Sequence, residues 1–476
     1  MPPSPIRKIL IVSHDIVAPA MAGPGIRYHA IAQALSREFD VTLAIPNPPD
    51  PRLEQDGLKI ASYQERNWPS LAPLIRQADV FMLNGYVVFL YPELMQEENL
   101  PPLIIDGYDP LLAEWLAATR PRPDEQRQWW AEKIRQLTPQ YLAGDFFICA
   151  SERQRDWWLG LLENIGRINY WTVCDDPALQ KLVAVVPFGL RATPPEHTRK
   201  VIREVWPGIG PHDRILLWGG GLWMWLDPLA AVQAVARIWE VRQDVRLVFP
   251  GTRRPIHGEM HPPTHREAIR QEAERLGLLD KAVFLGDWVE YQDWGNVLLE
   301  SDIGLSLNPQ EFLEAHLAYR TRVLEYIWAG LPMLVTRGDP TGELVAQYEL
   351  GKLVDTHDIE GIAAGLLELL DTPRATYQAR FSQVRQMLTW EKVCEPLAEF
   401  CRNPRHAADR EALGAGLGHP YYLPSIERLR EENDALRQDN QRLQTETQRL
   451  DALVKAYQQR RVIRLLDRLA ALRRSG

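Results

Sequence analysis

Short runs of apolar residues alternate with helical patterns along the first part of the chain. Each run is continuous, which is typical of a strand buried on both faces. The runs are Lys8–Ser13, Val41–Ile45, Val80–Leu83, Leu103–Ile105, Phe146–Ala150 and Val183–Val186. Because helical stretches separate them, the pattern predicts a parallel sheet covered by helices. This is an α/β, Rossmann-like, doubly wound domain over residues 1–190.

The same pattern restarts after a polar, proline-bearing stretch at residues 191–213. The second series of apolar runs comprises Ile215–Trp218, Val245–Phe249, Ala282–Leu285, Ile303–Leu307 and Met333–Val335. Helical patterns lie between these runs, and a further helical stretch covers residues 374–402. The sequence therefore predicts a second doubly wound domain over residues 191–403. The carboxyl ends of both sheets should face a cleft between the domains.

Beyond a linker predicted at residues 404–424, apolar residues recur in a heptad pattern. The a and d positions are Ile426, Leu429, Asn433, Leu436, Asn440, Leu443, Thr447, Leu450, Val454 and Tyr457. This regularity predicts a coiled coil over residues 425–458, and the two asparagines at a positions favour a parallel dimer. A homodimer is expected, although the partner could be another chain. A single solvated helix is the alternative.

The final stretch, residues 459–476, predicts a basic amphipathic helix. Val462, Leu465 and Leu469 share one face, and arginines surround it. Residues 424–476 hold 12 Lys and Arg against 8 Asp and Glu, a net charge of +4, so the rest of the chain carries −13. Such a helix fits peripheral contact with anionic lipid at the inner membrane face. It equally fits packing against its own acidic protein.

Composition narrows the functional class. The chain has 476 residues, 45% of them hydrophobic, as in ordinary globular proteins. A net charge of −9 argues against a nucleic-acid partner, because binding phosphates needs clustered Lys and Arg. The four cysteines show neither a C-x-x-C pair nor zinc-ligand spacing, and no apolar run is long enough to span a bilayer. We therefore expect a cytoplasmic protein.

Two glycine-rich loops directly follow predicted strands. In the first loop, Gly23 and Gly25 precede a helix, so backbone N–H groups could approach an anion there. In the second loop, Gly220 and Gly221 leave room for a phosphate or a sugar, and Trp223 could stack on a sugar or a base. Neither loop has the spacing of a dinucleotide-binding motif. Both are candidate parts of a donor site.

The segment between the last two predicted strands carries the most specific pattern. Thr321 is expected to cap a helix there. Arg320 and Arg322 would lie at its N-terminus, where their charge and the helix dipole both favour a diphosphate. Glu325, one turn into the helix, could accept hydrogen bonds from ribose hydroxyls. A buried network of carboxylates and guanidinium groups is the structural alternative.

These segments resemble the donor site of GT-B nucleotide-sugar glycosyltransferases, especially a bacterial polysaccharide-associated branch of the family-4-like group. Glu325 to Pro332 reads Glu-Tyr-Ile-Trp-Ala-Gly-Leu-Pro and matches the second half of the group's Glu-x7-Glu signature. The loop Gly23–Arg27 is similar to the group's loop near the donor diphosphate. Val185–Gly189 resembles its domain junction, and Ser151–Trp158 resembles the polysaccharide-associated branch. The resemblance implies a GT-B fold over about residues 6–400.

Two features depart from the group's pattern. Leu317 stands where the signature has its first Glu, so Glu314 or Glu311 would have to supply that carboxylate. The group's Arg and Lys after the glycine loop are absent from Trp223–Asp227. Other arginines, Arg253–Arg254 among them, would then neutralise the diphosphate.

The resemblance implies sugar transfer with retention at the anomeric carbon and without a bound metal. It also implies no cofactor, because the nucleotide sugar is a co-substrate. The acceptor would be a saccharide or a lipid-linked sugar in cell-surface polysaccharide biosynthesis. Asp109, which follows Asp106, and His14 are the acceptor-side catalytic candidates, with Glu314 as a third. Asp109 could instead cap the next helix. A GT-B nucleotide-sugar epimerase and a catalytically degenerate GT-B scaffold are the alternatives.

Overall fold

The computed structural model divides the chain into two compact units, residues 1–416 and residues 417–476. The residues that it describes are 7–19, 21–53, 58–97, 99–119, 122–251, 264–287, 289–410, 423–459 and 461–474. The first unit contains two parallel sheets, and the second is helical.

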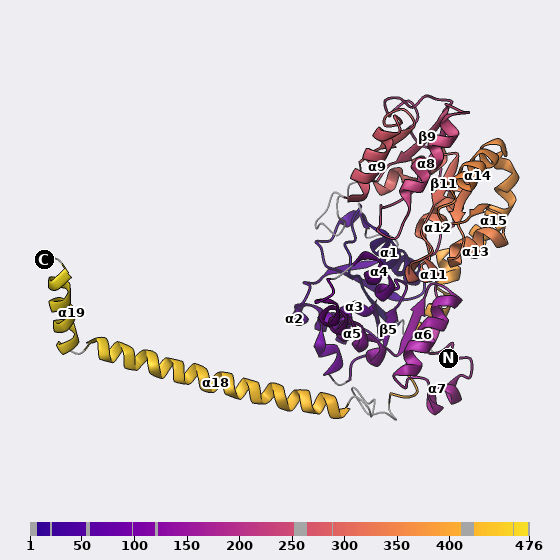
Figure 1. The fold of residues 1–476 in the computed structure, drawn as a ribbon. Helices are drawn as coiled ribbons and strands as arrows, with labels where there is room; N and C mark the ends of the chain where they lie inside the picture. Colours follow the sequence, from indigo (N-terminus) through magenta and orange to yellow (C-terminus); the bar gives the residue numbers. More distant parts are fainter. Residues whose placement is uncertain are drawn as a thin grey trace. The chain divides into compact units, whose positions relative to one another are not determined.

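The first sheet has seven parallel strands in the order β3-β2-β1-β4-β5-β6-β7. It lies in the indigo-to-magenta part of Figure 1. The strands are β1 (Lys8–Val12), β2 (Asp40–Ile45), β3 (Lys59–Ser62), β4 (Val80–Asn84), β5 (Leu103–Asp106), β6 (Phe146–Cys149) and β7 (Val183–Val185). The six predicted strands are confirmed, and β3 is an additional strand at the edge of the sheet.

The second sheet has six parallel strands in the order β10-β9-β8-β11-β12-β13. The strands are β8 (Arg214–Trp218), β9 (Val245–Phe249), β10 (Val283–Leu285), β11 (Ile303–Ser306), β12 (Met333–Thr336) and β13 (Gly351–Val354). The five predicted strands are confirmed, and β13 is an additional edge strand. In both sheets the strand order reverses direction beside the first strand. That reversal is the point where doubly wound folds bind their ligands.

Helices cover both sheets, so the central strands are buried along their whole length, as β4 and β5 are. The helices of the first unit are α1 (Gly23–Ser36), α2 (Trp68–Arg76), α3 (Gly85–Leu90), α4 (Leu111–Ala118), α5 (Gln126–Ala143), α6 (Glu152–Asn164), α7 (Tyr170–Asp175), α8 (Pro228–Trp239), α9 (Thr264–Arg275), α10 (Trp294–Glu300), α11 (Leu313–Leu317), α12 (Thr321–Ala329), α13 (Pro340–Gln347), α14 (Ile359–Asp371), α15 (Gln378–Met387), α16 (Trp390–Val393) and α17 (Glu395–Arg402). This layering explains why the strands read as unbroken apolar runs.

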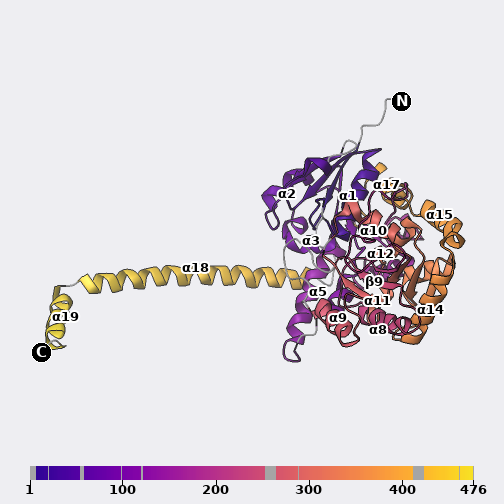
Figure 2. The same cartoon turned by 90° about the horizontal axis from the view of Figure 1, so that it is seen from above.

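The last helices of the first unit return to the first sheet. In Figure 2, the orange α17 lies beside the indigo α1. Phe400 of α17 stacks on Phe146 of β6 with ring centroids 4.5 Å apart. After completing the second domain, the chain thus returns to pack on the first domain.

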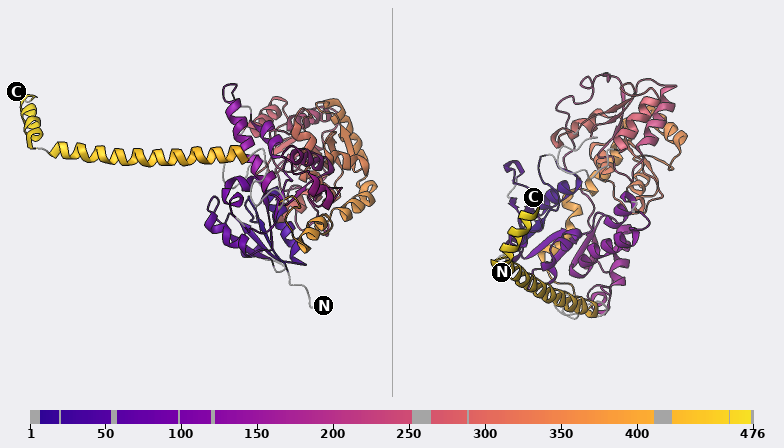
Figure 3. Two further views of the ribbon diagram at one scale, coloured as in Figure 1. Left: turned by 90° about the horizontal axis from the view of Figure 1, so that it is seen from below. Right: turned by 60° about the vertical axis from the view of Figure 1, so that its left-hand side comes forward.

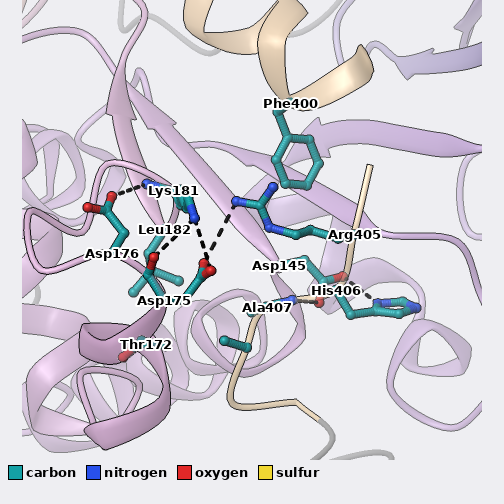
Figure 4. A pocket seen from close by; sticks show the side chains of 11 residues that line it. Asp145, Thr172, Asp175, Asp176, Lys181, Leu182, Phe400, Arg405, His406 and Ala407 are labelled. Atoms are coloured by element: carbon teal, nitrogen blue, oxygen red, sulfur yellow. Dashed lines mark hydrogen bonds and ion pairs between the residues drawn. The ribbon is translucent and has the colours of Figure 1, made fainter. Parts of the chain in front are cut away.

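The segment that follows α17, residues 403–410, is tied to the first domain by buried charges. Asp145 accepts a hydrogen bond from the backbone N–H of Ala407 and pairs with His406 (Figure 4). It also accepts a hydrogen bond from Arg410. Asp409 is fully buried and pairs with Arg167 at 2.7 Å. These contacts fix the end of the first unit to the domain in which the chain began.

The second unit consists of α18 (Leu423–Gln459) and α19 (Arg461–Arg474). Figure 3 shows α18 as one uninterrupted helix. Three of its heptad leucines are exposed in the single chain: Leu436 at 64%, Leu443 at 58% and Leu450 at 53%. No helix among the described residues is long and apolar enough to cross a membrane.

Candidate functional site

The carboxyl ends of the two sheets bring loops of both domains together. A β-carbon built on Gly23, at the start of α1, would lie 4.0 Å from the Thr321 methyl group at the start of α12. A β-carbon on Gly25 would lie only 2.4 Å from the Ile16 carbonyl oxygen. Glycine at residue 25 is therefore required by the close backbone, whereas Gly23 borders the space between the domains.

Arg27, one turn into α1, holds the end of β5. Its guanidinium donates two hydrogen bonds of 2.9 Å to the buried carboxylate of Asp106. It also donates to the carbonyl oxygens of Val186 and Pro187 at the domain junction, and the Tyr108 ring lies over it at 4.5 Å. Because Asp106 is engaged by Arg27, it does not form an acid/base pair with Asp109.

Asp109, unlike Asp106, is not engaged by Arg27 and is the acid/base candidate of the first domain. The helix α4 begins at Leu111, and no side chain caps it, so the alternative that Asp109 is a helix cap is wrong. Asp109 lines a pocket whose walls are mainly apolar side chains of α4, α5 and α6. Burial, with a contribution from Asp106, raises the pKa of Asp109 to about 7.

His14 follows β1. Its ring packs edge-on against Tyr28 with ring centroids 5.6 Å apart, and its Nδ1 has no hydrogen-bond partner among the described residues. Burial lowers the pKa of His14. At neutral pH the imidazole is therefore uncharged and can accept or donate one hydrogen bond.

The glycine loop after β8 forms the donor side. Gly219 donates its N–H to the Tyr326 hydroxyl at 2.8 Å, and Tyr326 in turn donates to the Leu305 carbonyl oxygen of β11 at 2.9 Å. Gly220 has φ of +80°, a conformation that favours glycine. Tyr326 thus fixes the shape of the loop. Sequence reasoning missed its role, although Tyr326 follows Glu325 in the signature.

Arg322 lies against this loop. Its Nη2 donates to the Gly221 carbonyl oxygen at 2.9 Å, and its guanidinium lies 5.1 Å from the Trp218 ring centroid. Its Nη1 is buried and has no hydrogen-bond partner among the described residues. Burial lowers the pKa of Arg322 to about 10, so the cation lacks full charge compensation and can gain from an anion.

Arg320 is placed differently. It forms a buried bidentate ion pair with Glu314, with N–O distances of 2.5 and 2.8 Å, and its Nε lies 3.5 Å from Asp339. The structural alternative, a buried network, thus describes Arg320 and Glu314. Arg320 is also the residue that precedes α12 at its N-cap, so the expectation that Thr321 is the cap is wrong.

Three further carboxylates, Glu325, Glu311 and Glu114, differ in their surroundings. Burial raises the pKa of Glu325 to about 7, against the opposing influence of Trp294, Arg191 and Arg322. Glu311, the other candidate for the missing signature carboxylate, is exposed and pairs with His357 at 2.9 Å. Glu114 of α4 was not a sequence candidate, and its pKa is raised well above the ordinary value by burial and by nearby carboxylates of both domains.

The remaining predicted residues are placed as follows. Trp223 stacks on Trp225 with ring centroids 5.2 Å apart and an interplanar angle of 9°, so one face of Trp223 is already covered. Arg253–Arg254 lie outside the described residues. No group of three or more His, Cys, Asp or Glu in the described part of the chain could hold a metal ion.

Direct hydrogen bonds join the two domains beside Asp109. The Tyr108 hydroxyl donates to the Tyr319 carbonyl oxygen at 2.7 Å, and the Gln154 amide donates to Leu317 at 2.8 Å. Arg153 donates to His316 at 2.9 Å. Arg153 and Gln154 belong to the segment Ser151–Trp158, which therefore connects the two domains. Ser151 caps α6 and so orients the first turn, in which both residues lie.

Two doubly wound domains, joined at a short junction and closed by a C-terminal segment that returns to the first, define the GT-B fold, and the chain has this fold. Among solved structures, HepE from Anabaena in complex with UDP matches with a TM-score of 0.56 at 14% identity, over 83% of this chain and 100% of that one. Sucrose-phosphate synthase from Thermosynechococcus elongatus matches with 0.60 at 14%, over 83% and 98%. WaaG, a glycosyltransferase involved in lipopolysaccharide biosynthesis, matches with 0.56 at 15%, over 83% and 100%. No family model and no curated sequence matches.

Proposed function

We propose that the protein is a glycosyltransferase that moves a sugar from a nucleotide-sugar donor to a saccharide or lipid-linked acceptor. We further propose that transfer proceeds with retention and serves cell-surface polysaccharide assembly. The observation that carries the donor assignment is Arg322, a buried cation with an unused N–H group beside the glycine loop. The complexes of HepE with UDP and UDP-glucose support a uridine nucleotide as the first donor to test.

On the donor side, the difficult step is departure of a diphosphate from the anomeric carbon. Negative charge grows on the leaving oxygen, and a preorganised cation in a poorly solvated site stabilises it more than water would. Arg322 and the first backbone N–H groups of α12 would supply this stabilisation. Arg320 would act indirectly, because its charge is already compensated by Glu314.

On the acceptor side, Asp109 would orient the attacking hydroxyl and accept its proton as the bond to the sugar forms. A carboxyl whose pKa is about 7 is well matched to proton transfer at neutral pH. Neutral His14 would hold a second hydroxyl of the acceptor. Activity should therefore rise with pH through about 7 as Asp109 ionises.

The donor assignment is tested by thermal shift of the full chain with UDP-, GDP- and dTDP-sugars. One nucleotide class should raise Tm, and Arg322→Ala should reduce the affinity for it about tenfold or more, the usual range for a charged hydrogen bond. Arg237→Ala, an exposed arginine of α8, is the matched control and should bind as the unmodified chain does.

Two results would contradict the proposal. Stabilisation by no nucleotide sugar would favour a non-catalytic GT-B scaffold. Equal donor affinity in Arg322→Ala and in the unmodified chain would remove Arg322 from the site.

A further inference from the structure

A cluster of large apolar side chains, four of them half-buried and two exposed, lies on α3, α4 and α5. We call it the aromatic face, and it consists of Tyr86, Phe89, Trp115, Trp129, Trp130 and Ile134. The Tyr86 ring lies 6.1 Å from Phe89 and 6.3 Å from Trp115. Trp130 is 44% exposed and Ile134 is 42% exposed, one turn apart on α5. Side chains of this size are normally buried, so their exposure here indicates an interaction surface.

Basic side chains are interleaved with these rings. The Lys133 ammonium lies 4.3 Å from the Trp115 ring centroid and 5.8 Å from that of Trp129, and Arg135 lies 5.2 Å from Phe89. Arg127 is exposed on the same helix, and within the described part of the chain no ion pair engages Arg127 or Arg135. The helix α5 carries three basic residues and one acidic residue, whereas the rest of the first unit is acidic. The face is thus locally cationic.

The same helices also form the Asp109 pocket. Leu111 and Leu112 of α4 and Tyr141 of α5 line that pocket, so one pair of helices carries both features. Along α5, Trp130 and Tyr141 are separated by about 16 Å at the usual helical rise. A surface bound by the aromatic face would therefore lie within reach of a pocket that is already mostly apolar.

We infer that the aromatic face docks on the surface of an anionic lipid bilayer and thereby presents the Asp109 pocket to a lipid-anchored acceptor. Indole and phenol rings prefer the boundary between headgroups and acyl chains, and Lys and Arg beside them pair with anionic headgroups. The inference rests on the proposed function for the acceptor, but the docking itself does not.

The test is co-sedimentation of the full chain with vesicles of phosphatidylcholine alone or with 30% phosphatidylglycerol. To remove the other candidate membrane contact, the chain carries Leu465→Ser and Leu469→Ser in α19. This chain should bind the anionic vesicles and bind the neutral ones several-fold less. Adding Trp130→Ser and Ile134→Ser should reduce binding about tenfold or more, since two interfacial anchors are lost.

The matched control is Trp171→Ser on α7, because Trp171 is 46% exposed but lies near Asp175 and Asp176. Its binding should be unchanged. Equal loss in the control, no effect of the Trp130 and Ile134 substitutions, equal binding to both vesicle types, or no vesicle binding at all would each overturn the inference. The last result would leave a protein partner for the face. Donor binding measured by thermal shift in the same variants keeps this outcome separate from failure of the proposed function.

Discussion

Asp109 and Asp106 are three residues apart, yet their surroundings separate their chemistry. Arg27 compensates the charge of Asp106 by a bidentate ion pair. Asp109 has no such partner, and both burial and the neighbouring Asp106 disfavour its ionised form. A carboxyl whose pKa is raised on folding costs stability as pH rises. Between its ordinary pKa and about 7, the unfolded chain has already lost the proton that the folded chain still holds.

Asp109→Asn should therefore make the folded protein more stable at high pH. Between pH 5 and pH 8, the free energy of unfolding of the unmodified chain should fall by about 2–3 kcal/mol relative to the variant. Urea denaturation at both pH values measures this difference. The exposed Asp156→Asn serves as the control and should show no such pH dependence. A difference independent of pH would mean that Asp109 does not titrate in this window.

The arginines show where prediction from sequence ends. Arg320 and Arg322 are two residues apart, and the sequence makes both equally good ligands for a diphosphate. In the folded chain, Glu314 engages the first, whereas Nη1 of the second has no partner among the described residues. Asp339, which completes the Arg320 network, is nearly twenty residues away and follows a different strand. Such pairing depends on three-dimensional proximity that residue spacing does not encode.

At the scale of elements, the two glycines of the first loop have different reasons to be glycine. Gly25→Ala places a methyl group against the Ile16 carbonyl and should destabilise the protein by about 2–4 kcal/mol. Gly23→Ala meets no atom closer than 4.0 Å and should change stability by less than about 1 kcal/mol. Chemical denaturation of both variants checks this contrast. Equal effects would mean that α1 adjusts its position readily.

Gly23→Ala has a second use, because it alters the space between the domains without unfolding the loop. If the loop borders the donor, this variant should weaken nucleotide-sugar binding while Tm without ligand stays the same.

The strands missed by sequence reasoning share a location. Both β3 and β13 lie at sheet edges, where β3 reads Lys-Ile-Ala-Ser and β13 reads Gly-Lys-Leu-Val. An edge strand has one neighbour and is partly exposed, so it has no need for the continuous apolar run that identifies a central strand. The pattern therefore predicts the two doubly wound domains and the interior of each sheet, together with the edge strands β7 and β10, but it misses the more polar edge strand of each sheet.

At the scale of the whole molecule, the helix α18 has an apolar seam that a single chain leaves exposed. At its d positions, Leu436, Leu443 and Leu450 are each more than half exposed. If α18 pairs with a second copy, the full chain should have twice the mass of one chain by light scattering. Leu436→Glu with Leu443→Glu should then give a monomer whose first unit unfolds at the same temperature.

The control is Gln441→Glu, which adds charge outside the predicted seam and should remain dimeric. A monomeric unmodified chain would show that α18 does not associate with itself, and a different partner would then be required.

The pair between Arg167 and Asp409 has a consequence for how the protein is made. The two residues are 242 positions apart, and at bacterial or eukaryotic elongation rates a ribosome needs about 12 to 50 s to add that many residues. During that interval the first domain exists without the carboxylate that compensates its buried arginine, and without Phe400 on β6. The first domain therefore cannot complete this buried ion pair until Asp409, more than two hundred residues later in the chain, has been synthesised.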